Sequence, residues 1–166
     1  MPHFDAAYNL ARWLTRSAAD ADDVVQEAYL RAFTFHESFR GGDARAWLLS
    51  IVRNTCYTWL RKNRPYELMA ELDESLPIAV ETTTPETLHL RRADVESVRE
   101  ALEKLPAEFR EVLVLREMEG LSYKEIADAS GLAIGTVMSR LSRARGRLHD
   151  CLSTPAVKEH GLKEKG

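Results

Sequence analysis

The chain has 166 residues, a formal net charge of −3, 45% hydrophobic residues and 30% charged residues, which is typical of one or two soluble domains. No apolar run reaches the ~18 residues that a membrane span needs, and the N-terminus lacks a secretory-signal layout, so we expect a cytoplasmic protein. Cys56 and Cys151 form no C-x-x-C pair, and neither a Gly-rich phosphate loop nor a nucleophile motif is present. The sequence therefore predicts no metal site, no cofactor and no enzymatic activity.

The charges are distributed unevenly along the chain. Residues 1–65 hold 9 basic and 7 acidic residues, residues 66–90 hold 6 acidic and no basic residues, and residues 91–150 hold 11 of each. An acidic segment thus joins two segments that can each carry a local basic surface.

Helix signals dominate the first segment, and almost nothing in the chain is typical of a strand. Asp20 and Asp23 precede an apolar run and predict a helix start for DDVVQEAYLRAFTF. The glycines of FRGGD interrupt the chain, after which Asp43 can cap a helix over residues 44–62. A proline ends this region, so residues 1–65 form the first predicted module.

A linker and a second helical module follow. The segment 66–84 has weak apolar periodicity, a proline and a run of threonines, and we interpret it as an acidic linker. The second module spans 85–152 and begins with a helix over 85–104, whose Thr-Pro start combines a cap with a first-turn proline. The next helix ends at Gly120, and the tail, 153–166, is predicted to fray.

Two further helices complete the second module. Ser122 and Glu125 form an S-x-x-E capping box for the first of them, and Gly131 ends it. The last helix runs from about residue 134 to residue 152, and steps of 100° place its apolar residues in one buried stripe. This stripe consists of Val137, Leu141, Ala144, Leu148 and Leu152. The predicted fold is therefore all-α, with two small helical domains joined by an acidic linker.

A separate flank of the last helix gathers arginines and small polar residues. Its members are Thr136, Ser139, Arg140, Arg143 and Arg147. A capped short helix, a glycine-containing turn and a second helix with a basic outer face form the helix-turn-helix layout. An ordinary solvated face could carry the same charges, but this context favours binding of duplex DNA.

The segment LPAEFREVLVLREMEGLSYKEIADASGLAIGTVMSRLSRARGRL resembles the C-terminal domain of bacterial sigma factors, a winged-helix-like helix-turn-helix domain. Response regulators share part of this pattern, so the first module has to decide between the two. The resemblance implies that the last helix reads the duplex minus-thirty-five promoter element. The implied contacts are Thr136, Met138, Ser139, Arg140, Arg143 and Arg147. Met138 and Ala133 differ from the residues that relatives often carry at these positions. The difference affects which bases the helix is expected to contact, but it does not affect the expected fold.

The helix after Asp43 has a core side and a polar side. Leu48, Val52, Cys56 and Trp59 share one side and are expected to be buried. The other side interleaves arginines with an aromatic ring and an amide, a combination that suits single-stranded DNA, because guanidinium groups follow phosphates while rings and amides engage unstacked bases. The residues on that side are Ser50, Arg53, Asn54, Tyr57 and Arg61.

The blocks DADDVVQEAYLRAF and FRGGDARAWLLSIVRNTCYTWLRKNR resemble the N-terminal sigma domain. Their order and spacing make the chain similar to an extracytoplasmic-function (group IV) sigma factor of the sigma-70 family over residues 5–152. The resemblance implies that the polar helix face and the preceding loop hold the melted minus-ten element. The loop contributes Arg40, Gly41, Gly42, Asp43 and Arg45.

The family resemblance also implies protein partners. One helix is expected to start with the acidic group Asp22, Asp23, Gln26 and Glu27. Such a group stabilises a helix by ~0.3–1 kcal/mol through the helix dipole. By resemblance, the same group binds the clamp of core RNA polymerase. The acidic linker is expected to enter the polymerase channels, and in the free protein to compete with DNA for the two basic faces.

The implied function is that of a sigma factor. It binds core RNA polymerase, directs promoter recognition and melting for a stress or envelope response, and is controlled by an anti-sigma factor. A stand-alone helix-turn-helix regulator and a sigma mimic that sequesters an anti-sigma factor are the alternatives. Transcription from purified core polymerase distinguishes among them.

Overall fold

The computed structural model describes residues 3–68 and 95–153, and within these two ranges the chain is helical and contains no strand. The predicted acidic linker beyond Leu68, the first part of the predicted helix over 85–104, and the tail beyond Ser153 lie outside the described residues. No helix in the described ranges is long and apolar enough to cross a membrane.

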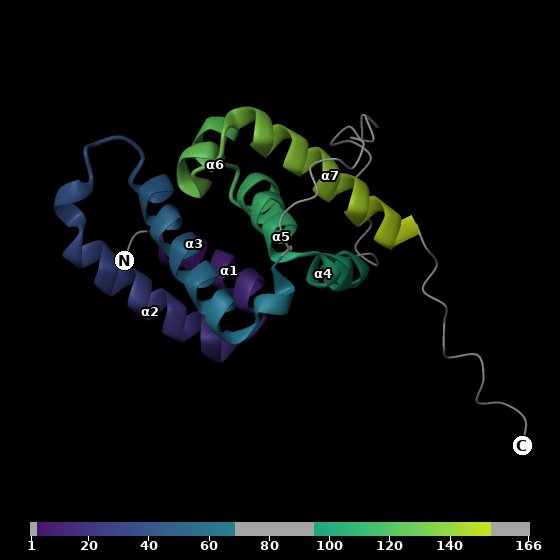
Figure 1. Cartoon of the computed structure of the whole chain (residues 1–166), viewed down its shortest axis with the longest axis horizontal. Helices are drawn as coiled ribbons and strands as arrows, with labels where there is room; N and C mark the ends of the chain where they lie inside the picture. The colour runs from purple at the N-terminus through teal and green to yellow at the C-terminus, as the bar shows by residue number, and fades with distance from the viewer. Residues whose placement is uncertain (1–2, 69–94, 154–166) are drawn as a thin grey trace, which may run out of the picture.

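The first module is a bundle of three helices, α1 (Phe4–Thr15), α2 (Ala18–Thr34) and α3 (Ala44–Asn63), which all pack against one another (Figure 1). Two short 3₁₀ turns, His36–Ser38 and Pro65–Glu67, follow α2 and α3. The helix α1 was not predicted, although its apolar residues recur at helical spacing: Ala7, Leu10, Ala11 and Leu14 are fully buried.

The starts of α2 and α3 depend on side-chain caps. The prediction that Asp20 begins α2 is wrong, because the helix begins at Ala18 and the hydroxyl of Ser17 accepts a hydrogen bond from the Asp20 backbone N–H at 3.3 Å. The predicted cap of α3 is confirmed. A carboxylate oxygen of Asp43 accepts from the backbone N–H of Arg45 at 2.9 Å and of Ala46 at 3.3 Å.

The second module contains α4 (Val95–Lys104), α5 (Ala107–Leu113), a π-helical turn (Val114–Met118), α6 (Tyr123–Ser130) and α7 (Ile134–Ser153). Both halves of the predicted capping box at Ser122 and Glu125 are present, and Gly131 ends α6 at a φ of 71°. These local signals set the α6–turn–α7 geometry of a helix-turn-helix. The predicted stripe on α7 is buried from Val137 to Leu148, and Leu152 at its end is half-buried.

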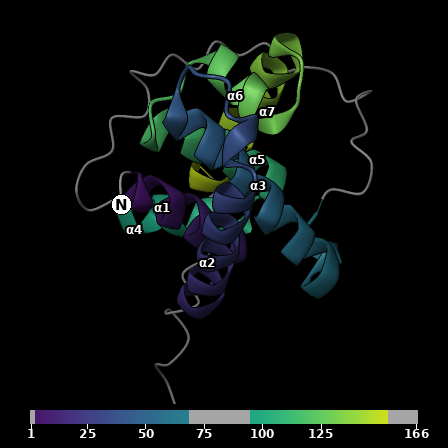
Figure 2. The same ribbon diagram turned by 90° about the vertical axis from the view of Figure 1, so that its left-hand side faces the viewer.

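The two modules pack directly against each other. Helix α3 lies against α6, and α1 lies against α5, so the buried apolar residues of both modules form one continuous cluster. Figures 1 and 2 show α2 and α7 on opposite sides of this junction. The junction therefore covers parts of α3 and leaves the outer faces of α2 and α7 on the outside of the molecule.

Candidate nucleic-acid interfaces

The outer flank of α7 is open at its ends and closed near its middle. Met138 is 52% exposed and Arg147 is also exposed, whereas Ser139 and Arg143 are half-buried. Thr136, also half-buried, accepts a hydrogen bond from the Ser139 hydroxyl at its carbonyl, at 3.1 Å. These residues lie on one helix as predicted, and their contacts with DNA stay a prediction.

Arg140 departs from the expected arrangement. It is only 7% exposed, so the expectation that it lies on the open flank is wrong for this structure. The residue lies about 80° around the helix from the middle of the apolar stripe, close enough to its edge to be covered by neighbouring residues. Arg145, on the other side of the stripe, pairs with Glu117 at 2.7 Å.

The polar side of α3 is closed by a carboxylate from the second module. Glu111 of α5 is 0% exposed and accepts hydrogen bonds from Arg53 at 2.5 Å and from the Tyr57 hydroxyl at 2.6 Å. The Arg53 guanidinium also lies over the Tyr57 ring, 4.2 Å from its centre. The expectation that Tyr57 is available on an open face is wrong here, because this side chain is 6% exposed. Arg53 and Tyr57 are thus brought together as predicted, but around a protein carboxylate.

Burial and charge at this cluster act on its titrating groups. Burial alone would lower the pKa of Arg53, but the charge and hydrogen bond of Glu111, together with Tyr57, leave that pKa raised. Burial is the main reason that the pKa of Tyr57 lies well above its ordinary value, and Glu111 adds to it. Burial also raises the pKa of the Cys56 thiol, consistent with an inert packed cysteine. The cluster is therefore a neutral phenol and a guanidinium–carboxylate pair.

The remainder of the predicted single-strand surface is more open. Arg40, Gly41, Gly42 and Asp43 of the loop are exposed, and so are Asn54 and Arg61 on α3. The two loop glycines have φ values of 84° and 104°, which other residues adopt only with strain.

Other side chains of this surface are engaged within the protein. Ser50 donates to the Trp47 carbonyl at 2.6 Å, and Arg45 donates to the Glu119 carbonyl at 2.6 Å, across the module junction. Trp59, expected in the hydrophobic core, is only half-buried, and the guanidinium of Arg64 lies over its ring, 4.9 Å from the ring centre.

The exposed side of α2 combines acidic and apolar residues. The four residues Asp22, Asp23, Gln26 and Glu27 are all exposed, as the resemblance requires. Because α2 begins at Ala18, they lie beyond its first turn, and the expected complementation of the helix dipole is wrong for them; the acidic residue of the first turn is Asp20. Leu30 and Phe33, each 68% exposed, continue this side toward the C-terminal end of α2. The sequence reasoning missed these two residues, although large apolar residues on the polar side of an amphipathic helix were a visible signal.

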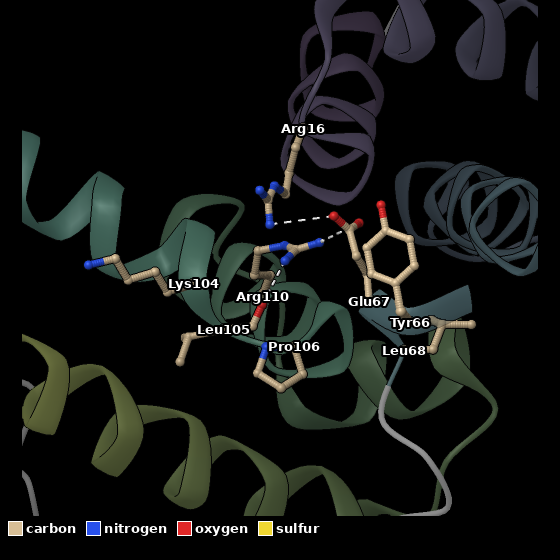
Figure 3. A pocket seen from close by; sticks show the side chains of 8 residues that line it. All are labelled: Arg16, Tyr66, Glu67, Leu68, Lys104, Leu105, Pro106 and Arg110. Carbon is tan, nitrogen blue, oxygen red and sulfur yellow. Dashed lines mark hydrogen bonds and ion pairs between the residues drawn. The ribbon is translucent and has the colours of Figure 1, made fainter. Parts of the chain in front are cut away.

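A second contact between the modules centres on Arg110 of α5 (Figure 3). Its guanidinium is 1% exposed and donates to the carbonyls of Trp13 at 3.0 Å and Leu14 at 3.2 Å, at the C-terminal end of α1, and to that of Leu105 at 2.6 Å. Burial lowers the pKa of Arg110, and Glu67 opposes this effect from 4.0 Å. Arg110 therefore joins α1 to α5, as Glu111 joins α3 to α5.

Glu67, counted in the linker by the sequence prediction, is anchored at this junction. It also pairs with Arg16 at 3.5 Å and Arg64 at 3.8 Å. A pocket of about 420 Å³ opens beside it, lined by Arg16, Tyr66, Glu67, Leu68, Lys104, Leu105, Pro106 and Arg110. The carboxylate thus pairs with Arg16, Arg64 and Arg110, none of which the sequence assigned to DNA binding.

Comparison with known families matches both modules. The sigma-70 region 2 model matches residues 1–66, and the sigma-70 region 4 model matches residues 96–148. These matches agree with the two helical modules of the fold and with the helix-turn-helix in the second.

Individual relatives extend the match across both modules. The chain is 37% identical over 149 residues to the ECF RNA polymerase sigma factor EcfG of Rhodopseudomonas palustris, which covers 89% of this chain and 80% of that protein. It is 39% identical over 136 residues to the ECF RNA polymerase sigma-E factor of Escherichia coli, covering 77% of this chain and 71% of the relative. It spans 59% of the SigE factor of Mycolicibacterium smegmatis, at 33% identity and 91% coverage of its own length.

Solved structures agree in fold. The sigma factor RpoE of Bartonella quintana, in complex with the anti-sigma factor NepR, aligns with a TM-score of 0.68 and 30% identity, over 92% of this chain and 93% of that one. CnrH, in complex with the cytosolic domain of CnrY, aligns with a TM-score of 0.65 and 28% identity, over 93% and 84%. The fold and its two basic helices therefore define a two-domain helical protein of the transcription machinery. The chain belongs to the extracytoplasmic-function family of RNA polymerase sigma factors.

Proposed function

We propose that this chain binds core RNA polymerase in the cytoplasm and directs it to promoters, without enzymatic activity of its own. The single observation that carries the proposal is the pair of basic helices, α3 and α7. Each lies in the segment that matches the corresponding sigma region, in the family's order. One module would hold melted DNA while the other reads duplex DNA.

The proposal assigns a role to each surface. The first module, 1–65, holds polymerase through Asp22, Asp23, Gln26 and Glu27, extended by Leu30 and Phe33. The α3 face and the FRGGDAR loop hold the melted minus-ten element. The second module, 85–152, uses the outer flank of α7 for the minus-thirty-five element, and residues 66–84 connect the two.

The closed junction adds a requirement to this function. A melted strand cannot reach Arg53 and Tyr57 while Glu111 is bound to both, since all three side chains are engaged and two are buried. The modules therefore have to separate, or at least shift, before the minus-ten element binds. A partner that stabilises the closed form would keep the protein inactive. The similar RpoE structure contains the anti-sigma factor NepR, which supports control of this chain by an anti-sigma factor.

Reconstituted transcription tests the proposal. Purified core polymerase, genomic DNA fragments and the full chain should yield transcripts with defined 5′ ends that are absent when either protein is omitted. A chain that binds selected duplexes but yields no such transcripts with core polymerase would be a stand-alone regulator. A chain that binds an anti-sigma factor but neither polymerase nor DNA would be a sigma mimic. Either outcome contradicts the proposal.

A further inference from the structure

Two large apolar side chains are exposed on the first half of α7. Ile134 is 46% exposed and Met138 is 52% exposed. They are four positions apart and are therefore neighbours on one side of the helix. The buried stripe that begins at Val137 does not include them, so the hydrophobic core does not account for either residue.

Short side chains separate Met138 from Arg143 around the helix. Steps of 100° place Gly135, Ser139 and Ser142 between Met138 on one edge of the outer face and Arg143 on the other. A Cβ atom added at Gly135 would meet nothing within 4 Å, so the space in front of this turn is open. The outer face of α7 thus has an apolar edge, a low centre and a basic edge.

The charge of α7 indicates what this face meets. From Ile134 to His149 the helix carries four arginines and no acidic residue. A polyanion such as duplex DNA is the partner that complements this charge. In helix-turn-helix proteins the N-terminal residues of the second helix contact base edges in the major groove. Ile134 and Met138 are the first and fifth residues of α7, which places them in that half of the helix.

Only one group in the major groove suits such side chains. Base edges present hydrogen-bond donors and acceptors, and thymine alone adds an apolar group, its C5 methyl. A thioether or an isoleucine side chain gains little from phosphates or polar base edges, but it can bury a methyl group. We infer that Ile134 and Met138 read thymine methyl groups in the duplex promoter element. This inference rests on the proposed function of α7, and it adds which chemical group of the duplex the helix recognises.

The test removes the methyl group and nothing else. In a promoter identified by the reconstituted transcription above, each thymine of the upstream duplex element is replaced in turn by deoxyuridine. The dissociation constant of the holoenzyme is then measured for each duplex. The loss of one buried methyl group, ~0.8 kcal/mol, corresponds to about fourfold weaker binding at one or two adjacent positions. For holoenzymes that carry Met138→Ala or Ile134→Ala, the dissociation constants for the thymine and the uracil duplex should differ by no more than about twofold.

Met118→Ala is the matched control. Met118 is similarly exposed, at 45%, but lies in the π-helical turn, where its sulfur accepts a hydrogen bond from Asn9 of α1 at 3.7 Å. This variant should keep the fourfold dependence on the methyl group. A wild-type holoenzyme that binds all uracil duplexes as tightly as the thymine duplex would overturn the inference, while its continued use of the upstream element would uphold the proposed function.

Other outcomes also contradict the inference. If the methyl dependence persists in both alanine variants, another part of the protein reads the methyl group. If Met138→Ala weakens association with core polymerase and leaves the methyl dependence intact, the apolar edge of α7 is a polymerase contact. If no upstream duplex element contributes to binding at all, both the inference and the assigned role of α7 fail.

Discussion

The two helices with basic faces, α3 and α7, differ in what lies against them. On α3, Arg53 and Tyr57 are bound to Glu111, a buried carboxylate of the other module. On α7, Met138 and Arg147 are exposed. A single chain thus presents one predicted DNA-binding surface to solvent and holds part of the other against itself. Under the proposed function, the free protein therefore restricts access to melted DNA more than access to duplex DNA.

The first prediction concerns a variant that lacks the contact between α1 and α5. Arg110→Met should lower the free energy of unfolding by about 3–5 kcal/mol, because it leaves the carbonyls of Trp13 and Leu14 without their donor in a buried junction. Denaturant titration of the full chain measures this. Arg116→Met is the control, since Arg116 donates one hydrogen bond within its own module, to Leu121, and should cost about 1 kcal/mol. Equal costs for the two variants would mean that the junction contributes no special stability.

The second prediction concerns the half-buried middle of the α7 flank. Arg143→Ala should cost about 1–3 kcal/mol of specific duplex binding if the guanidinium makes a bidentate base contact. Association with core polymerase should be unchanged. Competition binding on the identified upstream element and a scrambled duplex measures the specific part. Wild-type transcription from a promoter that depends on this element would count against the role of Arg143.

The third prediction concerns the closed face. Glu111→Gln should raise the affinity of the free chain for a minus-ten single strand about tenfold, because an amide holds Arg53 less tightly than a carboxylate does, by ~1.4 kcal/mol. Fluorescence anisotropy with a labelled oligonucleotide measures this. Glu117→Gln is the control, since Glu117 pairs with an arginine of its own module. An unchanged affinity in Glu111→Gln would show that Glu111 does not compete with DNA.

The smallest expected effect is on salt dependence. Arg147 is exposed and lies in the second half of α7, beyond the N-terminal residues that contact base edges in helix-turn-helix proteins, so we expect it to contact a phosphate. Arg147→Ala should weaken binding similarly for all duplexes and reduce the slope of log K against log salt by about one. An effect confined to one sequence would instead place Arg147 on a base edge.

Local features could be predicted from the sequence, and contacts between modules could not. The caps at Asp43 and Ser122, the C-cap at Gly131 and the buried stripe of α7 depend on residues within a few positions of one another, so their spacing is informative. The helix α1 had the same kind of periodic signal and was overlooked.

The pairing of Arg53 with Glu111 joins residues 58 positions apart and depends on how two modules pack. A helical wheel gives the direction of a side chain, but not the element that covers it. For the same reason, Tyr57 and Arg140 were expected on open faces and are buried. The expected masking of DNA faces by the linker lies largely outside the described residues. The carboxylate that the structure places on the α3 face comes from α5.

Closure of the free chain across α3, and its opening when polymerase binds, can be measured as a distance. Thr58 on α3 and Lys124 on α6 are exposed and belong to helices that pack together. Spin labels on Thr58→Cys and Lys124→Cys report the separation of the two helices by double electron–electron resonance. Cys151→Ser removes the exposed native cysteine, and the buried Cys56 is left in place. We expect one short distance in the free chain and a longer one after core polymerase is added. A free chain that already shows the long distance would contradict the account.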